Sequence, residues 1–248
     1  MKIVVVGGTG LIGTQVIAQL QQAGHEAVAA APSTGVDTLT GRGVDEALAG
    51  ADVVVDVSNS PSFADDDVLR FFTTSTRTLL DAEKRAGVRH HVALSIVGAD
   101  RNPDSGYLRA KVAQEELVRD GGVPWTVVRA TQFFEFAPRI ADGAVVDGAV
   151  RIPPVAFQPI ASADVARFVA EAAAAEPSGE VDDVAGPERV RFDEFIRAAI
   201  AGDGREVVAD PAAPYFGAVL ADDSIVPQGD ARLGAVTYAD FTAAHATA

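Results

Sequence analysis

The stretch Lys2-Ile-Val-Val-Val-Gly-Gly-Thr-Gly-Leu-Ile-Gly13 decides the fold of this chain. Its β-branched run from Ile3 to Val6 does not alternate with polar residues, which is typical of a strand buried on both faces of a parallel sheet. Gly7, Gly10 and Gly13 follow at three-residue spacing, so the chain can turn tightly and bring bare amides close to an anion. The pattern predicts a strand, a phosphate-binding turn and a helix whose amino end holds a pyrophosphate.

The composition restricts the class of protein. The chain has 248 residues, of which 48% are hydrophobic, and no apolar run approaches about eighteen residues, so we expect a soluble α/β protein. Nothing at the start resembles a signal peptide, which favours the cytoplasm. No cysteine is present, which excludes disulfides and thiolate chemistry, and the four histidines show no metal-ligand spacing. A net charge of −15 argues against nucleic acid or an anionic membrane as a partner.

Strand and helix patterns alternate along most of the chain. Further strands are expected at Ala27 to Ala31, Gly35 to Leu39, Ala51 to Val57, His91 to Ser95 and Trp125 to Val128, and helices at Leu11 to Ala23, Val44 to Ala49, Asp65 to Ala86, after Asp104 or Ser105, at Ser162 to Ala175 and at Phe192 to Ile200. The order predicts an α/β fold, a Rossmann-like doubly wound parallel sheet with a small C-terminal substrate-binding lobe. We expect one domain, with residues 1–130 mainly binding the cofactor and residues 131–248 mainly forming the interleaved lobe. His90 and His91 are expected to be surface and packing residues.

The end of the second strand bears on the choice of cofactor. An acidic residue at this position would bind the ribose 2′-hydroxyl of NAD, and the chain instead has Pro32, Ser33, Thr34 and Gly35. The hydroxyls of Ser33 and Thr34 can hold a 2′-phosphate, which favours NADP(H) over NAD(H). The nearest arginine is Arg42. Ser58 and Asn59 end another strand of the sheet, where contact with a cofactor ribose is expected.

Ser95, Tyr107 and Lys111 carry the candidate chemistry. A tyrosine and a lysine four residues apart lie on the same face of a helix, so we expect the ammonium to lie near the phenol and to lower its pKa toward the working range. Ser95 ends a strand and can donate a hydrogen bond to the same substrate oxygen. With three tyrosines and only three lysines in the chain, such a spacing would arise by chance in roughly 4% of cases.

These motifs, together with Val127-Val-Arg-Ala-Thr-Gln-Phe-Phe134, resemble the short-chain dehydrogenase/reductase superfamily in its atypical, NmrA-like branch. The resemblance covers about residues 1 to 200. It implies that Ser95 orients a carbonyl, that Tyr107 donates a proton and that Lys111 also holds the nicotinamide ribose. It places the dinucleotide against Gly7, Thr9, Gly10, Leu11, Ile12 and Gly13, and the nicotinamide near Ala130 and Thr131. Ala130 stands where the branch commonly has a proline, and the helix between the second and third strands is missing.

Three functions remain open from the sequence. The first is an NAD(P)H-dependent reductase of a small, apolar carbonyl compound, in which Phe133 and Phe134 either wall the substrate pocket or are core residues. The second is a non-catalytic redox sensor that binds the dinucleotide and presents it to a protein partner. The third, ranked lower, is a sugar-nucleotide epimerase or dehydratase. The sequence leaves open whether the protein is a monomer or a homodimer.

Overall fold

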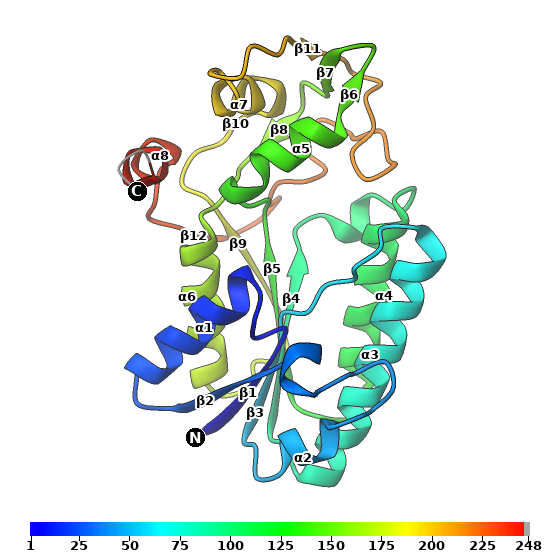
Figure 1. The fold of residues 1–248 in the computed structure, drawn as a ribbon, viewed down its shortest axis with the longest axis vertical. Helices are drawn as coiled ribbons and strands as arrows, with labels where there is room; N and C mark the ends of the chain where they lie inside the picture. Colours follow the sequence, from blue (N-terminus) through cyan, green and yellow to red (C-terminus); the bar gives the residue numbers. More distant parts are fainter. Residues whose placement is uncertain (246–248) are drawn as a thin grey trace.

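A seven-stranded parallel sheet forms the centre of the molecule (Figure 1). The structure is a computed structural model that describes residues 1–245. The strand order is β12-β9-β5-β4-β3-β1-β2. The strands are β1 (Lys2–Val6), β2 (Glu26–Ala30), β3 (Val53–Asp56), β4 (His90–Ile96), β5 (Trp125–Ala130), β9 (Val181–Ala185) and β12 (Arg232–Leu233). The prediction of a Rossmann-like α/β fold with a parallel sheet is confirmed.

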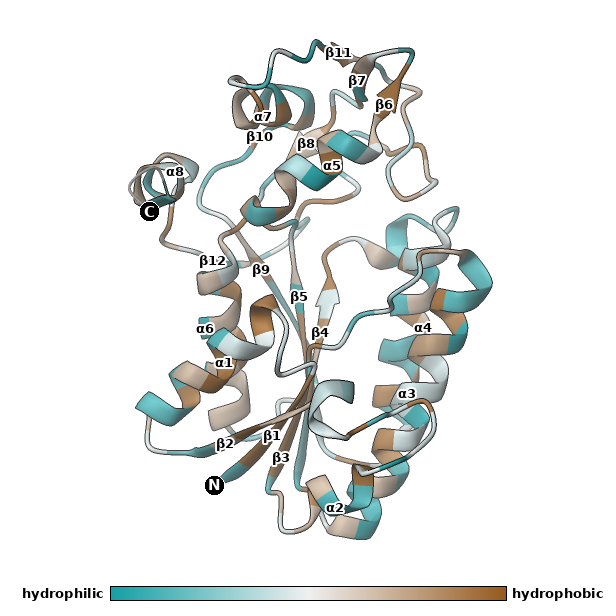
Figure 2. Cartoon of the chain, viewed as in Figure 1, coloured by the Kyte–Doolittle hydropathy of each residue, from teal (hydrophilic) through white to brown (hydrophobic). Residues whose placement is uncertain are grey.

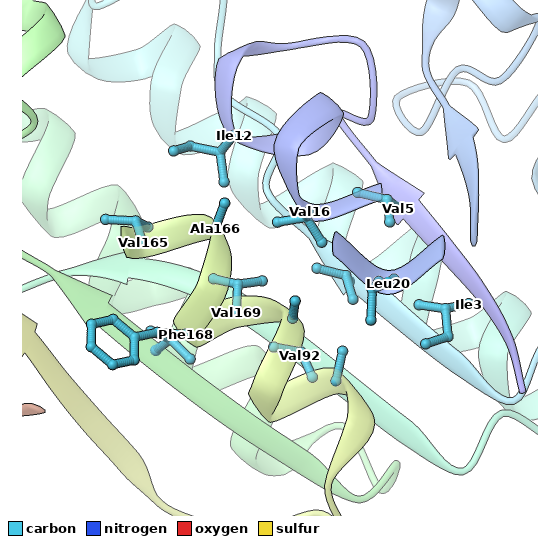
Figure 3. Close-up of a cluster of buried hydrophobic side chains, with 14 of the residues drawn as sticks. Ile3, Val5, Ile12, Val16, Leu20, Val92, Val165, Ala166, Phe168 and Val169 are labelled. Carbon is cyan, nitrogen blue, oxygen red and sulfur yellow. The ribbon is translucent and has the colours of Figure 1, made fainter. Parts of the chain in front are cut away.

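Helices cover both faces of this sheet (Figure 1). The helices α1 (Leu11–Gln22) and α6 (Ser162–Ala174) pack on one face, and α2 (Val44–Leu48), α3 (Asp65–Ala86) and α4 (Gly106–Asp120) lie on the other. Ile3 and Val5 of β1 pack with α1 and α6 (Figure 3), whereas Val4 belongs to the core on the opposite face. This two-sided burial explains why the first strand is apolar without alternation.

The apolar side chains lie where the layers meet. Figure 2 shows hydrophobic strands at the centre and hydrophilic residues on the outer sides of the helices. Ile12, Val16 and Leu20 of α1 are buried against the sheet, as their spacing predicts. Leu11, the first residue of the helix, lies beside the glycine turn and is 41% exposed.

The predicted third strand at Gly35 to Leu39 is wrong. After β2 the chain makes a short 3₁₀ helix, Pro32–Thr34, and then a loop held by a single bridge between Asp37 and Arg42. Gly35, with φ +88°, turns the chain away from the sheet. The next strand of the sheet is β3, and the only α-helix between β2 and β3 is α2, which is short.

A second group of elements lies beyond the carboxyl ends of the sheet strands, at the top of Figure 1. It contains α5 (Ala137–Gly143), β6 (Val145–Val146), β7 (Ala149–Ile152), β8 (Ala156–Phe157), β10 (Val190–Arg191), α7 (Phe192–Ala199) and β11 (Val207–Ala209), and α8 (Tyr238–His245) lies beside it. We call these elements the lobe, and they enclose an apolar core of their own. The sheet strands β9 and β12 come from the same C-terminal part of the chain, so the two regions interleave.

The two adjacent histidines are not surface residues. His90 and His91 begin β4, where they are 2% and 0% exposed. A ring nitrogen of His91 lies 2.8 Å from a carboxylate oxygen of Glu83, and His90 pairs with the hydroxyl of Thr126 at 2.9 Å. The expectation that they lie on the surface is wrong, and the expectation that they are packing residues is confirmed. Among residues 1–245, no helix combines the length and apolar character that crossing a membrane requires.

Candidate functional site

The glycine turn after β1 is packed too closely for any side chain. Gly7 has φ +78°, and a Cβ built on it would lie 2.9 Å from the Cα of Ser58. A Cβ on Gly8 would lie 2.6 Å from the Val5 carbonyl oxygen, and one on Gly13 would lie 2.3 Å from the Gly7 carbonyl oxygen. Contacts this short exclude every residue except glycine at these positions. The third glycine of the motif thus allows α1 to pack against the end of β1.

The amino end of α1 is open to an anion. Gly10 is its N-cap residue, with an extended backbone, and no side chain caps the first turn of this 12-residue helix. Thr9 and Leu11 are exposed beside it, while Ile12 is buried in the core and can offer only its backbone amide. Free amides and the helix dipole together stabilise a bound phosphate. The glycine cradle and the uncapped helix start fit the pyrophosphate of a dinucleotide.

Ser58 and Asn59 follow β3 directly across from this turn. The Ser58 hydroxyl oxygen is buried and has no hydrogen-bond partner among the described residues. Asn59 is exposed, and its side-chain oxygen accepts hydrogen bonds from the Ser60 amide at 2.9 Å and the Tyr107 hydroxyl at 3.1 Å. A buried hydroxyl without a partner beside Gly7 is the kind of group that a bound ligand satisfies.

In the turn after β2, the hydroxyls of Ser33 and Thr34, which were expected to hold a 2′-phosphate, have different surroundings. Thr34 uses its hydroxyl locally, since this group accepts a bond from the Ala31 amide at 2.9 Å and donates to the Ala31 carbonyl at 3.0 Å. Ser33 is exposed. A Cβ on Gly43 would lie 2.5 Å from the Gly35 carbonyl oxygen, so this contact holds the neighbouring, exposed Arg42 close to the turn. Ser33 and Arg42 therefore suit a 2′-phosphate better than Thr34 does.

The short α2 leaves a groove along the edge of the sheet. The groove has a volume of about 440 Å³ and runs over the face of β1 and β2. It is lined by Lys2, Val4, Glu26, Val28, Ala29, Thr34, Gly35, Val36, Gly43, Glu46 and Ala47. It reaches the turn after β2 but lies away from the residues with candidate catalytic chemistry.

Tyr107 and Lys111 lie on one face of α4, but their polar groups have different partners. The Tyr107 hydroxyl donates to Asn59. The Lys111 ammonium donates to the Leu94 carbonyl at 2.8 Å and to the side chain of Gln114, and it lies 4.3 Å from the centre of the Phe72 ring. The lysine is 4% exposed, so its N–H groups form their hydrogen bonds inside the protein. The expected pairing of ammonium and phenol is not present in this structure.

Burial is the main cause that shifts the pKa values of both groups. Burial raises the pKa of Tyr107 to about 12, against a smaller lowering by the hydrogen bond to Asn59. The expectation that Lys111 lowers this pKa is thus wrong for the structure as it stands, because Asn59 is neutral and the ammonium points elsewhere. Burial also lowers the pKa of Lys111 to about 8, opposed by the charges of Asp56 and Glu115.

Ser95 belongs to a different polar network. Its hydroxyl donates to Glu115 at 2.6 Å, and Arg129 donates to both oxygens of the same carboxylate at 2.8 and 2.7 Å. Arg129 also contacts Asp100 at 3.0 Å. Because Glu115 is 1% exposed and holds the serine hydroxyl, Ser95 is not free to orient a substrate carbonyl. The network instead joins β4, β5 and α4.

The residues after β5 divide between core and site. Phe134 is 3% exposed and packs in the lobe core with Phe195 and Tyr238, so the plain core interpretation applies to it. Phe133 packs between the sheet core and Phe136, 5.2 Å away. Neither ring forms an open wall of a substrate pocket among the described residues.

The three residues before these phenylalanines lie at the end of β5, where the nicotinamide is expected. Ala130 ends β5 and is buried, and the Thr131 hydroxyl donates to the Gln158 carbonyl at 2.6 Å. Gln132 was not expected in the site. It is 8% exposed, and neither atom of its amide has a partner among the described residues. A buried amide at the carboxyl end of a central strand is a candidate for holding an amide group of a ligand.

Aromatic residues from distant segments are the main part of the site that the sequence did not indicate. The ring of Phe63, in the loop before α3, lies 5.3 Å from the ring of Tyr107. The ring of Phe216, in the loop before β12, lies 4.9 Å from it. No local pattern marks these two positions, because the contacts join parts of the chain more than forty residues apart.

Comparisons with known proteins agree with this geometry. Residues 7–176 match the family described as NAD(P)H-binding. The chain is 32% identical over 206 residues to (4-alkanoyl-5-oxo-2,5-dihydrofuran-3-yl)methyl phosphate reductase of Streptomyces griseus, covering 76% of this chain and 69% of the relative. It is 24% identical to photosystem II assembly factor Ycf39 of Cyanophora paradoxa, covering 68% of this chain and 58%, less than two thirds, of that relative.

A solved structure shares the fold over nearly the whole chain. It is DesIV, a dTDP-glucose 4,6-dehydratase from Streptomyces venezuelae, with NAD and DAU bound. The TM-score is 0.71 at 17% identity, and the match covers 91% of this chain and 89% of the other. With a glycine cradle, an uncapped α1 and a family match over most of its sheet, the chain belongs to the NAD(P)H-binding family and has the NmrA-like, short-chain dehydrogenase/reductase type of fold.

Proposed function

We propose that this protein is an NADPH-dependent reductase of small, apolar carbonyl compounds, with Tyr107 as the proton donor. The observation that carries the proposal is the Tyr107 hydroxyl, which lies beside Asn59 at the carboxyl edge of the sheet, where ligands of such folds bind. Similarity to a reductase over 76% of the chain supports the reaction class. When bound, the reduced nicotinamide supplies the hydride.

The residues of this chain then handle the substrate oxygen and its proton. A pKa of about 12 keeps the Tyr107 phenol protonated at neutral pH. When a carbonyl oxygen replaces the Asn59 side-chain oxygen as the acceptor, the phenol donates a hydrogen bond to it and gives its proton to the alkoxide formed by hydride transfer, which is a far stronger base than phenolate.

Asn59 takes the orienting role that the sequence assigned to Ser95. Its side-chain oxygen holds the phenol until the substrate oxygen takes over the phenol's hydrogen bond, and the amide nitrogen of this exposed residue can donate to the substrate oxygen. We assign the amide of Gln132, buried and without a partner among the described residues, to the carboxamide of the nicotinamide, which has the same donor and acceptor groups. Lys111 acts as a positioning residue that ties α4 to the Leu94 carbonyl of β4.

The cofactor preference rests on the turn after β2. Ser33 and Arg42 offer a hydroxyl and a cation for a 2′-phosphate, and no carboxylate ends the strand to repel it. We expect NADPH to bind at least tenfold more tightly than NADH in a fluorescence titration. Arg42→Ala should weaken NADPH binding by about tenfold and leave NADH binding unchanged, as loss of one charge-assisted contact costs about 1.5 to 3 kcal/mol at most. Tighter binding of NADH by the wild type would overturn the preference for NADPH.

The reaction is tested by NADPH oxidation with benzaldehyde, hexanal, acetophenone and cyclohexyl methyl ketone. The proposal predicts protein-dependent oxidation with at least one of them, and no oxidation with any would contradict it.

The redox sensor remains the second candidate. It is favoured by one structural observation, that Ser95 and Lys111 are both committed to contacts inside the protein. The similarity to an assembly factor supports it further. A sensor would bind its protein partner according to the redox state of the dinucleotide. Tyr107→Phe would leave this partner binding unchanged.

A further inference from the structure

The rings of Phe63 and Phe216, from two distant segments, pack against the ring of Tyr107. Phe63, Tyr107 and Phe216 form this aromatic cluster. The centroids of Phe63 and Phe216 are 5.6 Å apart, with 29° between the ring planes, and each ring also contacts Tyr107. All three distances fall in the range at which aromatic rings attract one another. The cluster therefore brings the sheet half and the loop of residues 210–231 together at the candidate proton donor.

The backbone at Phe216 adopts a conformation that a phenylalanine rarely takes. Its φ is +47°, and the following Gly217 has φ +84°. Tyr215 and Ala218 exchange two backbone hydrogen bonds, at 2.8 and 3.1 Å, so the two residues between them form a tight turn with positive φ at both positions. Glycine, asparagine and aspartate are favoured in such a turn, and an aromatic residue there costs free energy. The ring of Phe216, rather than the turn, must account for this choice.

The turn is anchored in the lobe by a continuous series of rings. Tyr215 lies 4.7 Å from Phe216 and 5.4 Å from Phe192, which stacks on Phe157 at 4.1 Å. Phe157 and Phe192 are fully buried. The position of Phe216 over Tyr107 is thus fixed from the lobe core, not left to a loose loop.

Two rings of the cluster keep large areas in contact with solvent. Phe63 is 47% exposed and Phe216 is 39% exposed, although both lie against the phenol. Apolar rings exposed side by side are a typical feature of a ligand-binding surface. The partly exposed members of the cluster carry no charge, so the surface suits an uncharged, flat group.

We infer that Phe63 and Phe216 form the substrate-recognition surface and that the site takes planar, conjugated carbonyl compounds such as aryl ketones. The inference rests on the proposed function, because a carbonyl oxygen at the Tyr107 hydroxyl places the rest of the substrate against these two rings. A flat ring can then stack on them at the usual 4.5 to 7 Å, whereas a puckered saturated ring of the same size cannot. This surface replaces Phe133 and Phe134 as the expected wall of the pocket.

The test compares acetophenone with cyclohexyl methyl ketone, which match in size but differ in ring planarity. We expect the wild type to have the higher kcat/KM for acetophenone. Phe216→Leu and Phe63→Leu keep an apolar side chain and, at residue 216, the same backbone strain, so each should lower the ratio of the two kcat/KM values by about 2- to 10-fold. Val219→Ala is the matched control, since Val219 is 61% exposed in the same loop, and it should leave the ratio unchanged.

The result separates this inference from the proposed function. A ratio that both leucine variants preserve, or a wild type that prefers the saturated ketone, would overturn the recognition surface while the reductase activity stands. If neither ketone is reduced, binding of the same two ketones to the NADP⁺-loaded protein is measured by ligand-observed NMR. Preferential binding of acetophenone that Phe216→Leu abolishes would support the surface even though turnover fails, and equal or absent binding would overturn it.

Discussion

The glycine cradle and the aromatic cluster are the two halves of the candidate site, and they are built in opposite ways. The cradle is made of backbone from one continuous stretch, and its geometry depends on the absence of side chains at Gly7, Gly8 and Gly13. The cluster is made of large side chains, Phe63, Tyr107 and Phe216, from three segments. The difference indicates a division of labour. We propose that local backbone recognises the dinucleotide, whereas contacts that only the folded chain assembles recognise the substrate.

Removing the Tyr107 hydroxyl tests the cluster side of the comparison and should have the largest effect. Tyr107→Phe keeps the ring and its contacts but removes the proton donor. We expect turnover to fall by about 10²- to 10⁴-fold, the usual contribution of general acid catalysis. The affinity for NADPH, measured by fluorescence titration, should stay within about twofold, because the cradle is untouched. A variant that keeps wild-type turnover would remove Tyr107 from the mechanism.

A single methyl group added to the cradle should weaken cofactor binding, which Tyr107→Phe leaves nearly unchanged. In Gly13→Ala the new Cβ would lie 2.3 Å from the Gly7 carbonyl oxygen, so the turn must shift away from α1. We expect NADPH binding to weaken by about 10- to 100-fold, the loss of one or two charge-assisted hydrogen bonds. Gly143→Ala is the control, because nothing lies within 4 Å of a Cβ there. Equal affinities in the two variants would show that the cradle does not hold the cofactor.

This contrast also explains what the sequence could predict. The cradle, the sheet strands and α3 follow from local patterns, and the bounds of α3 were predicted from Asp65 to Ala86 without error. Tyr107 and Lys111 were correctly placed on one helix face, but their spacing could not show where each polar group points. Gln114 and the Leu94 carbonyl take the lysine, and Asn59 takes the tyrosine. These partners, like Phe63 and Phe216, are brought close only by tertiary packing.

The buried Lys111 ammonium provides the smallest and most specific prediction. Its folded pKa of about 8 lies below the ordinary lysine pKa of 10.5, so between these values the unfolded chain binds more protons than the folded one. The contribution of this group to stability must then rise with pH from about 8 to about 10.5 and stay constant below 8, with a total of about 3 kcal/mol. In urea unfolding, the wild type should gain this stability relative to Lys111→Met over that range. A difference between the two proteins that does not change with pH would mean that the ammonium is not buried as described.

The central claim, that the two halves of the site cooperate in hydride transfer, is tested most directly by following the hydride. NADPH carrying deuterium at C4, in separate samples for each face of the ring, is incubated with the protein and the four carbonyl compounds named above. The account predicts deuterium on the carbinol carbon of at least one alcohol product, from one face only, at a rate that Tyr107→Phe lowers by about 10²-fold or more. Reduced products without deuterium, transfer from both faces equally, or no alcohol from any of the four compounds would contradict it.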